Sequence, residues 1–483
     1  MSLLTKTHEK IILLALSTFV GAFLLWLAAI SPGIEGGMDS YNHYLISKNS
    51  WQHLHLFLDY WGKPIYNLLA SPFAQFGIYG MVIFNVLCLI GSAYLVYGIA
   101  SSLKIKYSWL AFIITLLSPI FLDNTISSLT EPLCAFLVTL TLYLLVKQRF
   151  IGGAVVAGLL PFARSEGFII FGVVLLFFIL KKANWKIFIS LFAASIFFNL
   201  LGWIFTGEPF WIITQNPYIN FELSGRNVCG HGSLFHYLWA GHYTFGLVTC
   251  ILLVIGSGIF LFKEFKNIKK RNLEMWLIGA SFVLYFAAHV FIWWKGMMGS
   301  CGYVRVMTVI APLASIIALY GINYLTSSLE KRVSKYSKLL TFGILIFIVL
   351  NAFYVPIRYY KYKYPLQISA EQEQYVKLAK WYNTQAFEER TKLYLYPYFS
   401  IIADIDPYNQ KEHLELWKSS LQYTKTGDII IWDSHFGPNE CNLPLDTLSS
   451  NPHWKEIHSI IPSQPIETIN RANFEIHVFE KTE

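Results

Sequence analysis

Eleven long apolar segments constrain the fold of this chain more than any other feature. A helix that crosses a bilayer needs about 20 apolar residues, with a range of roughly 17–25. Backbone polar groups must be hydrogen-bonded within lipid, so segments of this kind form helices. The sequence therefore predicts an α-helical, polytopic membrane protein with about 11 transmembrane helices. The predicted segments are Ile11–Ile30, Tyr79–Ser101, Tyr107–Leu122, Pro132–Val146, Ile151–Phe162, Gly167–Leu180, Ile187–Phe205, Tyr243–Phe262, Leu273–Trp294, Val304–Leu325 and Leu339–Val355.

The charge content supports a membrane environment and argues against a nucleic-acid partner. Charged residues make up 14% of the chain, whereas a typical soluble domain has about 25%. The net charge is +8, but most basic residues lie in short loops between apolar segments rather than on one polar face. Membrane lipids, and not nucleic acid, are the expected surroundings.

Basic residues also predict how the chain is oriented in the membrane. With the N-terminus inside, the inner connections carry 18 Lys and Arg residues and the outer connections carry 6. The positive-inside rule then places the N-terminus in the cytoplasm and, with an odd number of crossings, the C-terminal tail outside. Two short segments, Ile151–Phe162 and Gly167–Leu180, are expected to form a helical hairpin with the polar tip "PFARSEG" away from lipid.

The tail after the last apolar segment is a different kind of sequence. "AEQEQYVKLAKWYN" has helical spacing, whereas "KLYLYP", "GDIIIW" and "FEIHVFE" are typical of strands. We therefore predict two domains, a membrane domain over residues 1–356 and a small extracytoplasmic α/β domain over residues 357–483. Asp433, His435 and Glu440 in the tail could bind a metal, but a solvated loop is the favoured interpretation.

Unusual polar residues fall on the predicted outer side or just inside it. Ionisable groups at membrane depth are costly, so their presence points to a functional site. Two long outer loops rich in Trp, Tyr and Phe supply most of them, and Cys229 and Cys301 in outer connections could form a disulfide in an oxidising compartment. The ionisable residues are Asp39, Asp59, Lys63, Asp123, Glu131, Arg164, Glu166, Glu208, Glu222, Arg226, His231, His242 and Arg305.

Five motifs in a fixed order resemble a known family. "IEGGMDSYNHY" contains Asp39, and "DYWGKPIYNLLASPF", "SSLTEPLCAFLV", "LLPFARSEGFII" and "GYVRVMTVIAPL" follow it. Over roughly residues 11–355 the chain resembles integral-membrane glycosyltransferases of the GT-C superfamily. The resemblance implies a hexosyltransferase, with mannose as one candidate sugar. Its donor would be a polyprenyl-phosphate sugar, used on the non-cytoplasmic face, and its acceptor is an unidentified glycan, lipid or protein.

The resemblance also implies roles for particular residues. Asp39 is the candidate catalytic base, because transfer to an acceptor hydroxyl requires removal of its proton. Gly36 and Gly37 would let the chain turn and aim Asp39 inward, and the aromatic loop would raise the pKa of its carboxyl group. The candidate ligands of the donor phosphate are Arg305, Lys63, His231 and His242. The candidate substrate or acceptor contacts are Glu131, Arg164, Glu166, Glu208 and Tyr41.

The sequence departs from the family pattern at one position that bears on metal use. Many members have an Asp-x-Asp or Asp-Glu pair in the first outer loop, whereas this chain has Asp39 followed by Ser40. No cofactor is therefore implied with certainty, although a divalent metal remains an option.

Structural roles and other functions stay open beside these roles. Asp39 and Glu131 could cap helices, Arg164 and Glu166 could simply pair, and Arg305 could snorkel to the interface. A transporter or flippase of lipid-linked sugar would use a similar cavity without a base, and a non-catalytic assembly subunit would use the tail. For the location of the protein, a bacterial inner membrane is favoured over the endoplasmic reticulum.

Overall fold

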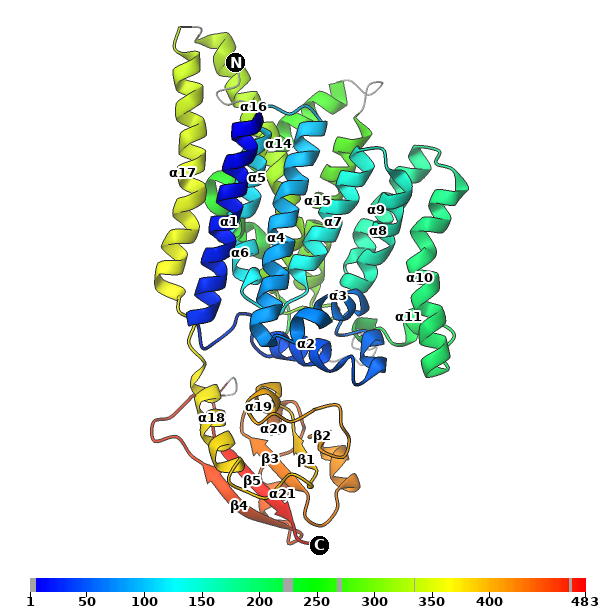
Figure 1. Ribbon diagram of the computed structural model, residues 1–483, viewed down its shortest axis with the longest axis vertical. Coiled ribbons are helices and arrows are strands. Elements are labelled where there is room, and N and C mark those ends of the chain that lie inside the picture. The colour runs from blue at the N-terminus through cyan, green and yellow to red at the C-terminus, as the bar shows by residue number, and fades with distance from the viewer. Residues whose placement is uncertain (1–5, 220–228, 267–271, 334, 469–470) are drawn as a thin grey trace.

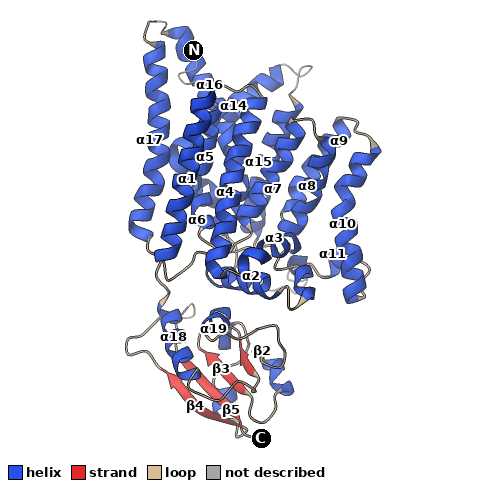
Figure 2. Cartoon of the chain, viewed as in Figure 1, coloured by secondary structure: helices blue, strands red, loops and turns tan. Residues whose placement is uncertain are grey.

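The computed structural model describes residues 6–219, 229–266, 272–333, 335–468 and 471–483, and shows a helical bundle followed by a small sheet domain (Figures 1 and 2). The elements of the membrane part are α1 (Lys6–Ile30), α2 (Gly37–Asn49), η1 (Leu54–Leu58), α3 (Pro64–Ala74), α4 (Gly77–Ser102), α5 (Ser108–Leu116), α6 (Pro119–Thr125), α7 (Glu131–Val146), α8 (Phe150–Ala163), α9 (Gly167–Leu180), α10 (Trp185–Thr206), α11 (Trp211–Thr214), α13 (His236–Gly241), η2 (His242–Gly246), α14 (Leu247–Lys266), α15 (Leu273–Lys295), η4 (Val304–Ile310), α16 (Ala311–Arg332) and α17 (Ser337–Lys363).

The helices coincide with the predicted apolar segments. Within the described residues, seven helices are long and apolar enough to cross a membrane, and the bent pair α5 and α6 would make an eighth. Three shorter apolar helices, α7, α8 and α9, pack beside them. The chain is therefore an integral, multi-pass membrane protein. Because the three short helices fall below the usual spanning length, the number of eleven crossings stays a prediction.

The outer surface of the bundle is suited to lipid. Large apolar side chains such as Ile204, Phe262 and Leu339 are more than half exposed, which would be a liability in water. In contrast, α16 is buried along most of its length at the centre of the bundle. The start of α1 and the sheet domain lie at opposite ends of the molecule (Figure 1), as an odd number of crossings requires.

Small residues allow α14 and α16 to pack closely. A Cβ atom on Gly256 would lie 2.1 Å from the carbonyl oxygen of Ile317, and one on Gly321 would lie 2.5 Å from that of Leu252. Such contacts between backbones stabilise helix pairs where lipid removes the usual hydrophobic driving force. The two glycines therefore set the spacing of these two helices.

The C-terminal part is an α/β domain, as the sequence predicts. Its strands form one sheet in the order β2-β1-β3-β5-β4, in which β1 is parallel to β2 and β3, and β5 is antiparallel to β3 and β4. The helix α17 continues past the predicted boundary at residue 356, as far as Lys363. The elements of the domain are α18 (Ala370–Tyr382), β1 (Lys392–Tyr394), α19 (Pro397–Ile402), β2 (His413–Glu415), η5 (Lys418–Tyr423), β3 (Ile429–Asp433), α20 (Phe436–Asn439), α21 (Asp446–Ser449), β4 (Trp454–Ile460) and β5 (Ile476–Lys481).

The α/β domain is attached to the bundle through α2, which lies between them in Figure 1. Tyr41 of α2 is 2% exposed and belongs to the apolar core of the α/β domain. Its hydroxyl accepts a hydrogen bond of 2.8 Å from Gln372, and its ring lies 5.1 Å from that of Tyr398. Farther along, His53 lies 2.7 Å from Asp406. The interface therefore holds one face of α2 in place.

The acidic cluster of the tail is not a solvated loop. Asp433 is buried, and its carboxylate accepts hydrogen bonds from the Tyr375 hydroxyl and from the backbone amides of His435 and Phe436. These bonds fix the turn from β3 into α20. The prediction of a solvated loop is therefore wrong for Asp433. His435 pairs with Glu371 at 2.9 Å.

We expect Gly256→Ala to lower the unfolding temperature relative to Gly343→Ala. Both changes improve helix propensity by about 1 kcal/mol, but overpacking against the backbone of α16 should cost about 1–3 kcal/mol at Gly256. Gly343 has open space around its Cβ position, which makes it the matched control. Thermal unfolding in detergent measures the difference, and equal temperatures for the two variants would contradict close packing of α14 on α16.

Candidate active site

A cavity of about 560 Å³ opens at the end of the bundle that faces the α/β domain. Its wall is formed by α2, the segment before α3, the start of α7, the turn between α8 and α9, α15, and the segment that leads into η4. The structure thus brings together residues that are far apart in the sequence. Six of the predicted site residues line it: Asp39, Lys63, Glu131, Arg164, Glu166 and Arg305.

The turn before α2 directs Asp39 into the cavity. Gly36 and Gly37 have φ angles of 85° and 54°, a conformation that side-chain-bearing residues rarely adopt. The Ser40 hydroxyl donates to the carbonyl of Glu35 and accepts from the amide of Ser128, so the turn is tied to the segment before α7. Gly36 occupies the N-cap position, and Asp39 is therefore not the cap of α2.

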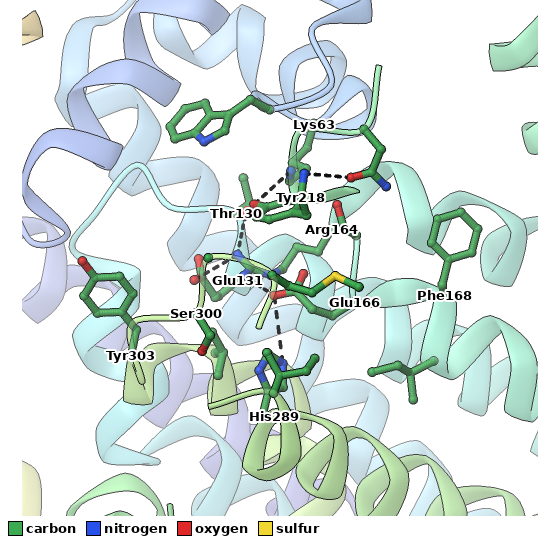
Figure 3. Close-up of a pocket in the computed structure, with 18 of the residues that line it drawn as sticks. Lys63, Thr130, Glu131, Arg164, Glu166, Phe168, Tyr218, His289, Ser300 and Tyr303 are labelled. Carbon is green, nitrogen blue, oxygen red and sulfur yellow. Dashed lines mark hydrogen bonds and ion pairs between the residues drawn. The ribbon is translucent and has the colours of Figure 1, made fainter. Parts of the chain in front are cut away.

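Charged side chains of alternating sign form a chain along the cavity wall, part of which is shown in Figure 3. Arg305 pairs with Asp39 and lies 3.4 Å from Glu131. Arg164 lies 2.9 Å from Glu131 and 2.8 Å from Glu166. Each arginine is therefore shared by two carboxylates, and the chain links α2, η4, α7 and the α8–α9 turn.

Burial makes this pairing necessary. The side chain of Glu131 is 1% exposed, and an unpaired carboxylate at such a site would pay a large desolvation cost. Glu131 begins α7, where a carboxylate also interacts favourably with the helix dipole. The expected pairing of Arg164 with Glu166 is confirmed, and both also face the cavity.

The environment of Asp39 differs from the sequence-based expectation. Apolar, aromatic surroundings were predicted for Asp39, but its side chain is 35% exposed and pairs with Arg305. The availability of this carboxylate to an acceptor hydroxyl therefore depends on where Arg305 lies.

Lys63 is a buried cation at the start of α3. Its ammonium group donates to the carbonyl of Tyr60 and to the hydroxyl of Tyr218, at 3.1 and 3.4 Å. Burial lowers the pKa of Lys63 to about 8, although the nearby Glu166 acts in the opposite direction. The same burial, together with nearby cations, lowers the pKa of His43 well below its ordinary value.

Several buried polar atoms of the wall have no hydrogen-bond partner within the described part of the chain. Buried polar groups are almost always satisfied in folded proteins, so a cluster of exceptions around one cavity indicates a site for a polar ligand. These atoms are His43 Nδ1, Glu131 Oε2, Arg164 Nε, Ser165 Oγ, Glu166 Oε2 and His289 Nε2.

The opposite side of the cavity is apolar. It is formed by residues of α9, α11 and α15, among them Phe168, Ile169, Ile212, Ile213 and Ile292. The cavity therefore offers a charged wall and an apolar wall to one ligand, an arrangement suited to a lipid with a charged head group.

Four predicted site residues do not line the cavity. His231 and His242 are exposed, and the ring of His242 bonds to the carbonyl of Trp239. Glu208 lies just after the end of α10 and does not line the cavity. Tyr41 packs into the core of the α/β domain. Glu222 and Arg226 lie outside the described residues.

Cys229 and Cys301 form the predicted disulfide, with Cα atoms 5.0 Å apart.

Sequence reasoning missed several polar residues of the wall, among them His43, His289 and Tyr218. His43 lies one helical turn after Asp39, a spacing that places both on one face of α2. His289 lies within a predicted span, where the rule for intramembrane ionisable groups could have found it. Tyr218 lies in an aromatic-rich loop and carries no such signal.

The described residues do not form a metal centre. No group of three or more His, Cys, Asp or Glu side chains among them could hold a metal ion. The cavity carboxylates are instead paired with arginines, so this arrangement does not fit a divalent cation.

Comparisons with known proteins are informative only at the level of structure. No family model and no curated protein matches the sequence. The structure of ArnT from Cupriavidus metallidurans bound to undecaprenyl phosphate matches with a TM-score of 0.60, at 8% identity over 98% of both chains. The apo state of the same protein matches with a TM-score of 0.54, at 11% identity over 98% of both chains.

The chain has the fold of ArnT. The likeness confirms the predicted helical membrane bundle with a C-terminal α/β domain, since the coverage extends over both parts. At these identities the likeness concerns the fold alone. An oligosaccharyltransferase from Archaeoglobus fulgidus, in complex with zinc and sulfate, has a TM-score of 0.46 at 13% identity, over 80% of this chain and 61% of that one.

We expect Glu131→Ala to destabilise the protein by about 3–5 kcal/mol, because it leaves Arg164 and Arg305 without their shared carboxylate in a buried site. Glu330→Ala is the control. It removes an exposed partner of Lys106 at 3.6 Å and should cost no more than about 1 kcal/mol. Thermal unfolding in detergent measures both variants, and similar stabilities would show that Glu131 is not the centre of the charged chain.

Proposed function

We propose that this protein is an integral-membrane glycosyltransferase that moves a sugar from a polyprenyl-phosphate donor to an acceptor on the non-cytoplasmic face. The observation that carries this proposal is one cavity lined by Asp39, by the cations Lys63 and Arg305, and by a set of apolar side chains. The same fold occurs in ArnT bound to undecaprenyl phosphate, which supports a polyprenyl phosphate as the lipid.

The two cations are suited to bind the donor phosphate. The planar guanidinium of Arg305 can contact two phosphate oxygens at once, and Lys63 adds a second positive charge to the same cavity. Charge grows on the phosphate as its bond to the sugar breaks, so cations held in place stabilise the transition state. The apolar wall would take the first isoprene units of the donor.

Donor binding would also prepare the base. A phosphate that binds Arg305 competes with Asp39 for the guanidinium, so Asp39 loses its partner when the donor arrives. The freed carboxylate then takes the proton of the acceptor hydroxyl while that oxygen attacks the anomeric carbon. The sugar–phosphate bond breaks on the opposite face, which predicts inversion at the anomeric carbon and release of the polyprenyl phosphate.

The site should lie on the outer side of the membrane. The cavity and the α/β domain share one end of the bundle, opposite the start of α1 (Figure 1), and the positive-inside rule assigns that end to the non-cytoplasmic side. The disulfide between Cys229 and Cys301 is compatible with an oxidising compartment there, such as the outer face of a bacterial inner membrane.

One assay tests this function against a flippase and against an assembly subunit. The purified protein is given a radiolabelled polyprenyl-phosphate hexose in detergent, with a membrane extract as the source of acceptors. A glycosyltransferase moves label from the lipid to another molecule, whereas the other two classes leave it on the lipid. Label that stays on the lipid, or that leaves it equally in extracts without the protein, would contradict the proposal.

We expect Asp39→Asn to reduce the transfer rate by roughly 10²–10⁴-fold, because the amide cannot accept the proton. Folding should be nearly unchanged, since the side chain is partly exposed and Asn can still bond to Arg305. Donor binding should persist in this variant. Arg305→Ala is the companion, and it should weaken both binding and rate because the phosphate is present in both states. Near-normal transfer by Asp39→Asn would exclude Asp39 as the base.

We expect donor affinity to fall as pH rises through about 8. The pKa of Lys63 is lowered to about 8, so the free protein loses this cation above that pH, whereas the phosphodiester of a polyprenyl-phosphate hexose keeps its charge. The loss should approach about tenfold, as expected for a charge-assisted hydrogen bond. Lys63→Arg should remove the pH dependence. A titration of binding from pH 6.5 to 9.5 measures both, and the same fall in the variant would assign it to another group.

A further inference from the structure

His289 is a buried histidine near the C-terminal end of α15 that points toward Glu166 of the charged series (Figure 3). It belongs to α15, is 5% exposed, and its Nε2 atom has no hydrogen-bond partner within the described residues. The rings of Tyr285 and Tyr237 lie 4.7 and 6.3 Å from the imidazole and pack around it. An unsatisfied polar atom at such a site costs about 1–3 kcal/mol, so its position calls for a ligand.

The spacing between His289 and Glu166 fits one hydroxyl group. His289 Nε2 lies 4.0 Å from Glu166 Oε1, which is too far for a direct hydrogen bond. An oxygen atom between them could lie about 2.8 Å from each atom. A hydroxyl there would accept from the imidazole N–H and so give His289 Nε2 its partner. It would also donate to Glu166 Oε1, which already accepts from Arg164.

Other unsatisfied atoms continue from this point toward Asp39. Glu166 Oε2, Arg164 Nε and Glu131 Oε2 are buried without hydrogen-bond partners in the described part of the chain, and all three residues line the same cavity. Acceptors and a donor thus follow one another along the wall. A ligand with several hydroxyl groups on one ring matches this series better than a ligand with a single polar group.

Lys63 relates these unsatisfied atoms to the proposed binding site of the donor phosphate. Lys63 lies close enough to Glu166, Arg164 and Glu131 to interact with their charges. A phosphate bound by Lys63 and Arg305 would therefore leave the covalently attached sugar beside these residues. The attacking acceptor would approach from the Asp39 side.

We propose that Glu131, Arg164, Glu166 and His289 form the subsite for the donor sugar, and that His289 determines specificity by hydrogen-bonding one sugar hydroxyl together with Glu166. This inference rests on the proposed function. The subsite takes a sugar whose recognised face carries hydroxyl groups.

The test compares two lipids, polyprenyl phosphate without a sugar and a polyprenyl-phosphate hexose chosen as the tightest binder from a panel. Two variants keep the size of the side chain in different ways. His289→Phe keeps the ring and removes the polar atom, and His289→Gln keeps a polar group near Nε2. Binding of both lipids to purified protein is measured for the wild type and for each variant, together with thermal unfolding as a check on folding.

The subsite predicts a selective loss. His289→Phe should weaken binding of the polyprenyl-phosphate hexose about tenfold, as expected for one hydrogen bond shared with a charged group, while binding of polyprenyl phosphate stays unchanged. His289→Gln should restore part of the loss. A donor that lacks the bridging hydroxyl should bind the wild type as weakly as the complete donor binds His289→Phe.

Other outcomes would overturn the subsite. Equal loss for both lipids in His289→Phe would mean that the residue acts on the phosphate or on the fold. Unchanged binding of both lipids with a raised KM for the acceptor would place the acceptor, and not the donor sugar, at His289. Failure of the proposed function is distinguishable, because the wild type would then transfer no label, whether or not it binds the two lipids.

Discussion

The shared arginines are the interaction on which this site depends. Arg305 joins Asp39 to Glu131, and Arg164 joins Glu131 to Glu166. Buried charges are tolerated only when they are paired, so the contacts that allow this end of the bundle to fold also place the functional groups. This series of ion pairs can exchange a partner at the end formed by Asp39, whose side chain is partly exposed. The proposed mechanism uses that freedom, since a donor phosphate would replace Asp39 as the partner of Arg305.

The fold could be predicted from the sequence because backbone polar groups in lipid must be hydrogen-bonded within the protein, which few structures allow. Apolar segments of spanning length must be helices, and the predicted Gly167–Leu180 coincides with α9. In the tail, period-2 and period-3.6 patterns identified β3, β5 and α18 in the same way. The strands β2 and β4 were missed, since β2 has only three residues and β4 has a single buried residue, so that neither shows a clear alternating pattern.

The site could be predicted only in part, because the side of the membrane on which a residue lies does not determine where its side chain points. Asp39 and Tyr41 are two residues apart in α2, so their side chains diverge; one lines the cavity and the other packs into the α/β domain. His231 and His242 lie on the predicted side but away from the cavity. The pairing of Asp39 with Arg305 joins residues 266 positions apart, and no local pattern encodes such a contact. His289 lies within a predicted apolar span and was not identified from the sequence as a site residue.

A structure of the protein with a bound polyprenyl-phosphate hexose tests the central claim most directly. The account predicts a phosphate between Lys63 and Arg305, an Asp39 carboxylate that has lost Arg305 and faces the anomeric carbon, and a sugar ring beside Glu166. A phosphate bound elsewhere, with Asp39 and Arg305 still paired to each other, would contradict it.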